Sequence, residues 1–293
     1  MGSSLLQNVG RRLRRSPLLL WAGHHGSVWI GTRFSESIPM YFVIGYPKSG
    51  TTWVTQLVAD YLMLPYPQHL LLPATFPAVI HGHESLTSSL IGRCIYTVRD
   101  PRDAVMSYYW RSTKQLKINK TKGRLRAYQR GLRANPDNLE DHAANIPAFV
   151  ERYLENTSGT RHTWRGHVQT YLRERERVPL VTYERLLESP VEEMSQAIEA
   201  LTGETTDRER MGWAVAKYSF ANRKKVITPG YDKSFLRSGR SGGWRDWVTR
   251  KTAEVFAERC GDELVQFGYE ADASWIDACP PALPEREPEA AHA

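Results

Sequence analysis

The chain has 293 residues, 41% of them hydrophobic, and a formal net charge of +7, which allows one large α/β domain or two small ones. Positive charge suits nucleic acid, an acidic membrane or an anionic cofactor, but the sequence has no arginine–glycine repeat, zinc-finger spacing or RNP-type motif, so we expect no nucleic-acid partner. The three cysteines are far apart and lack metal-ligand spacing, which argues against disulfides and a metal site and favours a cytoplasmic location.

Residues 1–37 are predicted to form an N-terminal arm. Four arginines within positions 11–15 precede an apolar run over residues 17–23, which is far shorter than the roughly 20 residues of a membrane-spanning helix. This order resembles a secretion signal superficially, but no small-residue cleavage site follows. We expect the arm to pack on the domain, or to lie on an anionic membrane surface or beside the substrate.

A buried strand is predicted at residues 41–44, followed by a glycine-bounded loop and a helix over residues 53–64. Backbone N–H groups at such a helix start favour an anion. The spacing of Gly45 and Gly50 matches the nucleotide P-loop, but Thr51 stands where that motif has its lysine, and Lys48 lies inside the loop. The loop is therefore predicted to hold a single phosphate with a transferable group just beyond it.

Two further strands are predicted, at residues 93–98 before a helix that begins near Pro101, and at residues 178–182. Strands that alternate with helices predict a P-loop-like three-layer α/β/α fold with a central, mostly parallel sheet, in a single domain over residues 38–277. Ligands of such sheets bind beyond the carboxyl ends of the strands. Residues 278–293 are rich in proline, glutamate and alanine and are predicted to be a disordered tail.

Residues 47–53, Pro-Lys-Ser-Gly-Thr-Thr-Trp, resemble the 5'-phosphosulfate loop of the sulfotransferases that use 3'-phosphoadenosine 5'-phosphosulfate (PAPS). The cytosolic small-molecule branch, in a bacterial-like variant, is the most similar, and further matches run to about residue 249. The resemblance implies in-line transfer of a sulfuryl group to a hydroxyl or amine of a small-molecule acceptor. It implies no metal, and 3'-phosphoadenosine 5'-phosphate (PAP) as the product.

Three residues are expected to be catalytic. Negative charge builds on the bridging phosphate oxygen during transfer, so the site needs a cation there, and Lys48 is placed to supply it. The site also needs a base that takes the proton of the acceptor. The family's histidine position falls on His83. Because the following Glu84 departs from the family pattern, His81 stays open as a second candidate. Ser107 is expected to reach the 3'-phosphate and to temper Lys48.

The resemblance also assigns residues to the bound nucleotide. Arg99 and Ser107 match the family's 3'-phosphate segment, and an arginine fork suits phosphate oxygens. Near the C-terminus Ser238 replaces a family lysine, so one cation is lost there. The expected cofactor-binding residues are Pro47, Lys48, Ser49, Gly50, Thr51, Thr52, Trp53, Arg99, Ser107, Tyr183, Phe220, Arg237, Ser238 and Gly239.

Two other functions stay open from the sequence, a P-loop nucleotide hydrolase or kinase and a non-catalytic nucleotide-binding relative. The acceptor is expected to be partly apolar or phenolic, because Tyr66, residues 70–72 and Phe76 lie in a variable loop. The basic segment over residues 111–145 is either a solvated face or a lid. The family's dimerisation segment is only partly kept after residue 244, so no oligomeric state is predicted.

Overall fold

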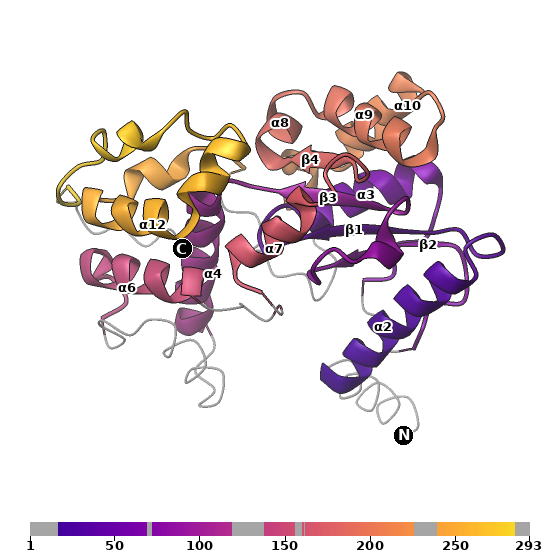
Figure 1. The fold of residues 1–293 in the computed structure, drawn as a ribbon, viewed down its shortest axis with the longest axis horizontal. Helices are drawn as coiled ribbons and strands as arrows, with labels where there is room; N and C mark the ends of the chain where they lie inside the picture. The colour runs from indigo at the N-terminus through magenta and orange to yellow at the C-terminus, as the bar shows by residue number, and fades with distance from the viewer. Residues whose placement is uncertain are drawn as a thin grey trace. The chain divides into compact units, whose positions relative to one another are not determined.

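The computed structural model describes residues 17–68, 72–118, 138–155, 160, 162–225 and 239–284. The chain divides into two compact units, each built from separated stretches (Figure 1). Unit 1 consists of Met1–Gly45, Gly50–Thr97 and Thr170–Ser219, and unit 2 of Tyr46–Ser49, Val98–Gln169 and Phe220–Ala293. The single domain predicted over residues 38–277 thus contains two units whose chain segments alternate.

Unit 1 is organised around a four-stranded sheet in the order β2-β1-β3-β4. Strand β1 pairs in parallel with both neighbours, so that Phe42 lies opposite Ile80 on one side and Cys94 on the other. Strands β1 and β3 are almost wholly buried, which explains why their sequences are apolar runs. The α/β class with a parallel sheet is therefore confirmed. The strands are β1 (Met40–Gly45), β2 (Ala78–Gly82), β3 (Cys94–Val98) and β4 (Leu180–Thr182).

Four helices of unit 1 share one hydrophobic core with the sheet. Helix α3 contacts β1, β2, α9 and α10, and its residues Val54, Leu57 and Val58 are at most 1% exposed. Helix α10 begins at an aspartate cap, where the Asp207 carboxylate accepts hydrogen bonds from two backbone N–H groups. These helices are α3 (Thr51–Leu62), α8 (Tyr183–Glu188), α9 (Pro190–Thr202) and α10 (Arg208–Lys217).

Within the predicted N-terminal arm, helix α2 (Pro17–Arg33) packs on the rest of unit 1 through small residues. A side chain at Gly26 would overlap Pro73 at 2.5 Å, and one at Gly31 would meet Met40 at 2.9 Å. The buried Ser27 hydroxyl accepts a 2.7 Å hydrogen bond from the backbone N–H of Ala74. Of the helices in the described ranges, none is long and apolar enough to cross a membrane.

Unit 2 is helical and is held together by a buried arginine. Arg102, 1% exposed, pairs with Asp100 at 2.7 Å and Glu270 at 2.6 Å. Its guanidinium also lies over the rings of Trp244 and Trp275, at 4.0 and 4.5 Å. The elements of unit 2 are α4 (Pro101–Ile118), α6 (His142–Glu155), α7 (Trp164–Leu172, whose end belongs to unit 1), α11 (Phe220–Lys225), η3 (Gly243–Asp246), α12 (Arg250–Gln266) and η4 (Ala273–Ile276).

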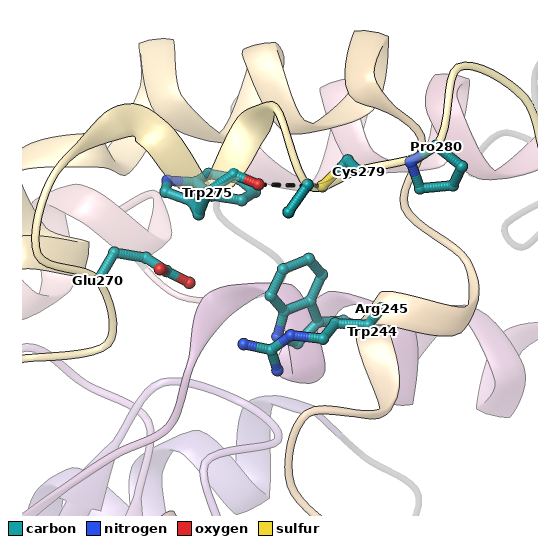
Figure 2. A pocket seen from close by; sticks show the side chains of 7 residues that line it. Trp244, Arg245, Glu270, Trp275, Cys279 and Pro280 are labelled. Carbon is teal, nitrogen blue, oxygen red and sulfur yellow. Dashed lines mark hydrogen bonds between the residues drawn. The ribbon is translucent and has the colours of Figure 1, made fainter.

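The end of the described chain packs on this unit. Cys279 is buried, and its thiol donates to the carbonyl oxygen of Trp275 (dashed line in Figure 2). The backbone N–H of Arg250 donates to the Pro280 carbonyl at 2.8 Å. Packed chain therefore continues beyond residue 277, where the sequence predicts the tail to begin, because a small apolar thiol fits beside the indole. Residues 285–293 lie outside the described residues.

Replacing Arg102 with methionine removes the shared partner of Asp100 and Glu270 and leaves two carboxylates in or near a dry interior. We expect Arg102→Met to lower the free energy of unfolding by about 3–5 kcal/mol in urea denaturation. The matched control is Arg245→Met, since Arg245 stacks on the same Trp244 ring at 4.5 Å but is exposed; it should cost less than about 1 kcal/mol. Equal losses in both variants would contradict the buried-pair explanation.

Candidate functional site

The loop between β1 and α3 is shaped by its glycines. A side chain at Gly45 would lie 2.5 Å from the Thr97 carbonyl oxygen, so only glycine fits at the end of β1. Lys48 and Gly50 both adopt positive φ, 77° and 88°. The Gly50 carbonyl then accepts from the N–H of Trp53 at 2.8 Å, which starts α3. A lysine in this left-handed region costs backbone energy, which is typical of functional loops.

Aromatic rings of unit 1 flank the start of α3. A side chain on Gly50 would come within 2.8 Å of the Tyr183 ring, so this ring lies against the loop backbone. Trp53 meets Tyr183 edge to face, with centroids 6.2 Å apart. The structure thus brings together Gly50, Trp53 and Tyr183, which the sequence assigns to one nucleotide. Thr51 and Thr52 are the first two residues of α3.

His83 follows strand β2 and contacts the last residue of β1. Its Nδ1 lies 2.7 Å from the carbonyl oxygen of Gly45. Because a carbonyl oxygen only accepts, Nδ1 must carry the proton of the neutral ring, and Nε2 then has a lone pair. This is the tautomer that a general base needs.

The second candidate, His81, sits inside β2 opposite Val43. Its Nδ1 lies 2.9 Å from the hydroxyl of Tyr66, and its ring centroid lies 5.8 Å from that of His83. The two imidazoles are therefore neighbours with different partners. Only His83 is held by the backbone at the first residue of the loop, which favours it over His81.

Sequence reasoning missed a partner of this region, His24 of α2. The His24 Nε2 lies 2.8 Å from a carboxylate oxygen of Glu84, the residue after His83. Burial alone raises the pKa of Glu84, but the hydrogen bond and charge of His24 and the charge of His83 outweigh it, so the pKa lies below its usual value. No spacing pattern links positions 24 and 84, so the pair could not be found without the fold.

Unit 2 holds the middle of the phosphate loop. The Pro47 carbonyl accepts from the Tyr153 hydroxyl at 3.3 Å, and the buried Tyr46 ring packs on Tyr153 at 5.7 Å. The N–H of Ser49 donates to the Tyr46 carbonyl at 3.1 Å. The Ser49 hydroxyl is buried and makes no hydrogen bond within the described structure. An orphaned buried hydroxyl next to Lys48 is suited to an anion that accepts from it.

The β3–α4 connection carries Arg99 and, two turns into α4, Ser107. Arg99 donates to the Arg240 carbonyl at 3.4 Å and lies 3.9 Å from Asp103. Asp103 accepts from the N–H groups of Gly242, at 2.7 Å, and Trp244, at 3.0 Å. Burial raises the pKa of Asp103, in spite of the lowering by Arg99 and these N–H groups. This carboxylate fixes the glycine-rich C-terminal segment to the start of α4, a role the sequence does not reveal.

Two more predicted residues meet in unit 2. Gly239 has φ 61°, and a side chain there would come within 2.8 Å of the Phe220 ring. Phe220 therefore packs directly on the backbone of the glycine-rich segment. Arg237 and Ser238 lie outside the described residues.

Unit 2 also contains a cavity of about 270 Å³. Figure 2 shows its lining, which includes Trp244, Glu270, Trp275 and Cys279 and contains none of the predicted site residues. Within the described ranges, no three histidine, cysteine, aspartate or glutamate side chains are grouped as a metal site would require.

Residues 81–268 match the family model described as "Sulfotransferase domain", which covers more than half of the chain. The chain belongs to the sulfotransferase family. The match includes His83, Arg99, Ser107, Tyr183 and Phe220, while the phosphate loop precedes it. Membership confirms a sulfotransferase enzyme rather than a nucleotide hydrolase or kinase.

Similar proteins are sulfotransferases of animals and plants. Sulfotransferase 2A6 of Rattus norvegicus is 23% identical over 77% of this chain and 84% of that protein. Sulfotransferase 1B1 of Mus musculus is 26% identical over 75% and 81%, and cytosolic sulfotransferase 13 of Arabidopsis thaliana is 24% identical over 75% of each.

Solved structures share the fold of this sulfotransferase. Mouse sulfotransferase SULT7A1 complexed with PAP aligns with a TM-score of 0.59 and 16% identity, over 88% of this chain and 95% of that chain. Retinol dehydratase in complex with androsterone and inactive cofactor PAP aligns with a TM-score of 0.55 and 16% identity, over 81% and 85%. The P-loop-like expectation for the fold is confirmed.

Gly50→Ala should destabilise the protein for two reasons, the strained φ and the overlap with Tyr183. Gly203→Ala is the matched control, because Gly203 has φ 75° and nothing within 4 Å of an added Cβ. We expect about 1–2 kcal/mol loss for the control and about 1–3 kcal/mol more for Gly50→Ala in urea denaturation. Equal losses would show that the Tyr183 ring does not constrain the loop.

Proposed function

We propose that this sulfotransferase transfers the sulfuryl group of PAPS in line to a hydroxyl, or an amine, of a small apolar or phenolic molecule. The observation that carries the proposal is the 2.7 Å contact between His83 Nδ1 and the Gly45 carbonyl. It joins the base to the first residue of the phosphate loop. PAP in the related structures is the nucleotide left after PAPS gives up its sulfuryl group, which supports PAPS as co-substrate.

The residues of the loop fit an anionic nucleotide. The orphaned Ser49 hydroxyl and the N–H groups at the start of α3 are donors for the 5'-phosphate. The Trp53 and Tyr183 rings provide apolar faces for adenine. Arg99, with Ser107, serves the 3'-phosphate, as their match to the family segment implies.

Each proton and electron pair has a destination in the proposed step. The acceptor oxygen forms a bond to sulfur while the bond from sulfur to the bridging phosphate oxygen breaks, and that oxygen keeps the electron pair as PAP leaves. Nε2 of His83 takes the acceptor proton. Lys48 neutralises the charge that grows on the bridging oxygen. Ser107 holds Lys48 away from this oxygen until the acceptor binds.

The surroundings of the proposed base support the proposed acceptor class. Tyr66 and His81 place aromatic surface beside His83, with a ring separation of 5.6 Å between them. One related structure contains androsterone and another contains retinol, and one relative is named 3-alpha-hydroxysteroid sulfotransferase. These support a hydroxylated apolar molecule. We place the enzyme in the cytoplasm, where the relatives named cytosolic sulfotransferases act.

Replacing the cation or the base should stop turnover without unfolding the protein. We expect Lys48→Ala and His83→Ala each to lower kcat by about 100-fold or more, measured as transfer of radiolabelled sulfate from PAPS to a panel of phenols and hydroxysteroids. His81→Ala is the matched control and should lose much less. If His81→Ala loses more activity than His83→Ala, the assignment of the base is reversed.

The 3'-phosphate assignment is tested by comparing two nucleotides. PAP should raise the melting temperature of the wild type at far lower concentration than adenosine 5'-phosphate, which lacks the 3'-phosphate. Arg99→Gln should weaken PAP binding by about 10- to 100-fold while adenosine 5'-phosphate binding is unchanged, since one charge-assisted contact is lost. Arg245→Gln, an exposed arginine of the same unit, should leave both unchanged. Equal weakening of both nucleotides by Arg99→Gln would contradict the assignment.

A further inference from the structure

The outward face of α2 carries large apolar side chains that water reaches. Leu18, Trp21 and Trp29 are 72%, 56% and 62% exposed, and Phe34, just after the helix, is 46% exposed. At 100° per residue the first three lie within about 80° of one another around the helix axis. The small residues Gly23, Ser27 and Gly31 are buried and occupy the opposite side.

Ring contacts arrange this surface along the helix. Trp21 lies 4.5 Å from the ring of His25, and Trp29 meets Phe34 at 5.8 Å. Exposed apolar surface continues beside the helix at Leu72, which is 76% exposed and precedes the Pro73 that packs on α2. Contiguous apolar patches of this kind on a soluble domain usually mark an interaction surface.

The positive charge of the N-terminal segment favours an anionic partner for this face of α2. The first 35 residues contain five arginines, at positions 11, 12, 14, 15 and 33, and no aspartate or glutamate. The whole chain has a net charge of only +7, so positive charge is concentrated in this segment. Arginines next to exposed tryptophan and leucine match an anionic lipid surface, where indoles settle at headgroup level. A second copy would bring five like charges against five and is disfavoured.

We propose that the outer face of α2 binds the surface of a bilayer that contains anionic phospholipid. The protein would rest on the membrane without crossing it. The apolar side chains supply burial and the arginines supply the preference for acidic headgroups.

The test is co-sedimentation of the full chain with vesicles of phosphatidylcholine, with and without phosphatidylserine. The wild type should sediment with the acidic vesicles and be released by salt. The double variant Trp21→Ser/Trp29→Ser should bind the acidic vesicles at least about tenfold more weakly than the wild type. Trp213→Ser is the matched control, because Trp213 is 67% exposed on α10, and it should bind as the wild type does. Substituting glutamine for the arginines at positions 11, 12, 14 and 15 should remove the preference for phosphatidylserine.

Several results would overturn the proposal. One is the absence of wild-type sedimentation with acidic vesicles, and another is undiminished binding by the double tryptophan variant. A third is a wild-type dimer in solution that the double variant converts to a monomer, which would make the face a contact between copies. PAP-induced thermal stabilisation should be the same in all variants, which confirms that they are folded.

A second inference, independent of the first, concerns Glu84 and rests on the proposed function. The Glu84 carboxylate folds over Gly82, where a Cβ would overlap it, and is held by His24 at 2.8 Å. The two side chains are 21% and 20% exposed. A carboxylate fixed in this way, directly after the proposed base, is not explained by the family pattern, which has no acid at this position.

Glu84 is an anion that interacts by charge with His83. His81 and, through it, Tyr66 lie on one side. Burial and the charge of Glu84 raise the pKa of the Cys94 thiol to about 12, so Cys94 stays neutral. Glu84 itself stays ionised at neutral pH because its pKa is lowered. A nearby negative charge favours a protonated imidazole.

We infer that Glu84, oriented by His24, is a positioning residue that stabilises the imidazolium of His83 after it takes the acceptor proton. Glu84→Gln keeps a polar partner for His24 and removes the charge. It should lower kcat by about tenfold or more and move the acid limb of the pH–rate profile to lower pH, with the affinity for PAP unchanged. His24→Gln should shift the profile in the same direction.

The neighbouring His25→Gln is the matched control and should leave the profile where it is in the wild type. An unchanged acid limb in both Glu84→Gln and His24→Gln would overturn the role of Glu84 while leaving the sulfotransfer proposal intact. Absence of transfer by the wild type to every acceptor would instead count against the proposed function. If PAP no longer stabilises Glu84→Gln, that variant is misfolded. The pH–rate profile of His24→Gln then tests the role of Glu84.

Discussion

The lack of a side chain at Gly45 is the constraint on which the site depends. A Cβ there would strike the Thr97 carbonyl, so only glycine lets β1 run this close to β3. The same residue ends the strand, begins the phosphate loop and offers its carbonyl to His83. One backbone position thereby connects the sheet, the phosphate loop and His83.

Arg99 and Arg102 are separated by only two residues but have different uses. Arg102 is enclosed by two carboxylates and two indoles, so its charge is neutralised by partners within unit 2. Arg99 has a longer contact with Asp103 and a backbone carbonyl partner. Such weaker local contacts can be exchanged for phosphate oxygens, whereas breaking those of Arg102 would uncover buried charge. The proposed function therefore assigns the phosphate to Arg99 and not to Arg102.

The sequence was sufficient for features written in consecutive residues. The apolar runs of β1, β3 and β4 and the glycines at 45 and 50 could be predicted, because each follows from local spacing, whereas β2 is not predicted and His83 is assigned through the family resemblance. Contacts between distant segments could not be predicted. His24 with Glu84, and Asp103 with the N–H groups of Gly242 and Trp244, depend on how the chain returns on itself, and their residue types are ordinary at the surface. The division into two alternating units is hidden for the same reason.

If His83 is the base, as we propose, its bond to the Gly45 carbonyl would also limit how it releases the acceptor proton. An imidazole with both nitrogens exposed to proton carriers can relay a proton through the ring, entering at one side and leaving at the other. Here Nδ1 is committed to an oxygen that cannot take its proton. In the proposed reaction, a proton collected at Nε2 would therefore have to leave from Nε2. The sulfated product would have to move away from this nitrogen before the histidine could discharge to water.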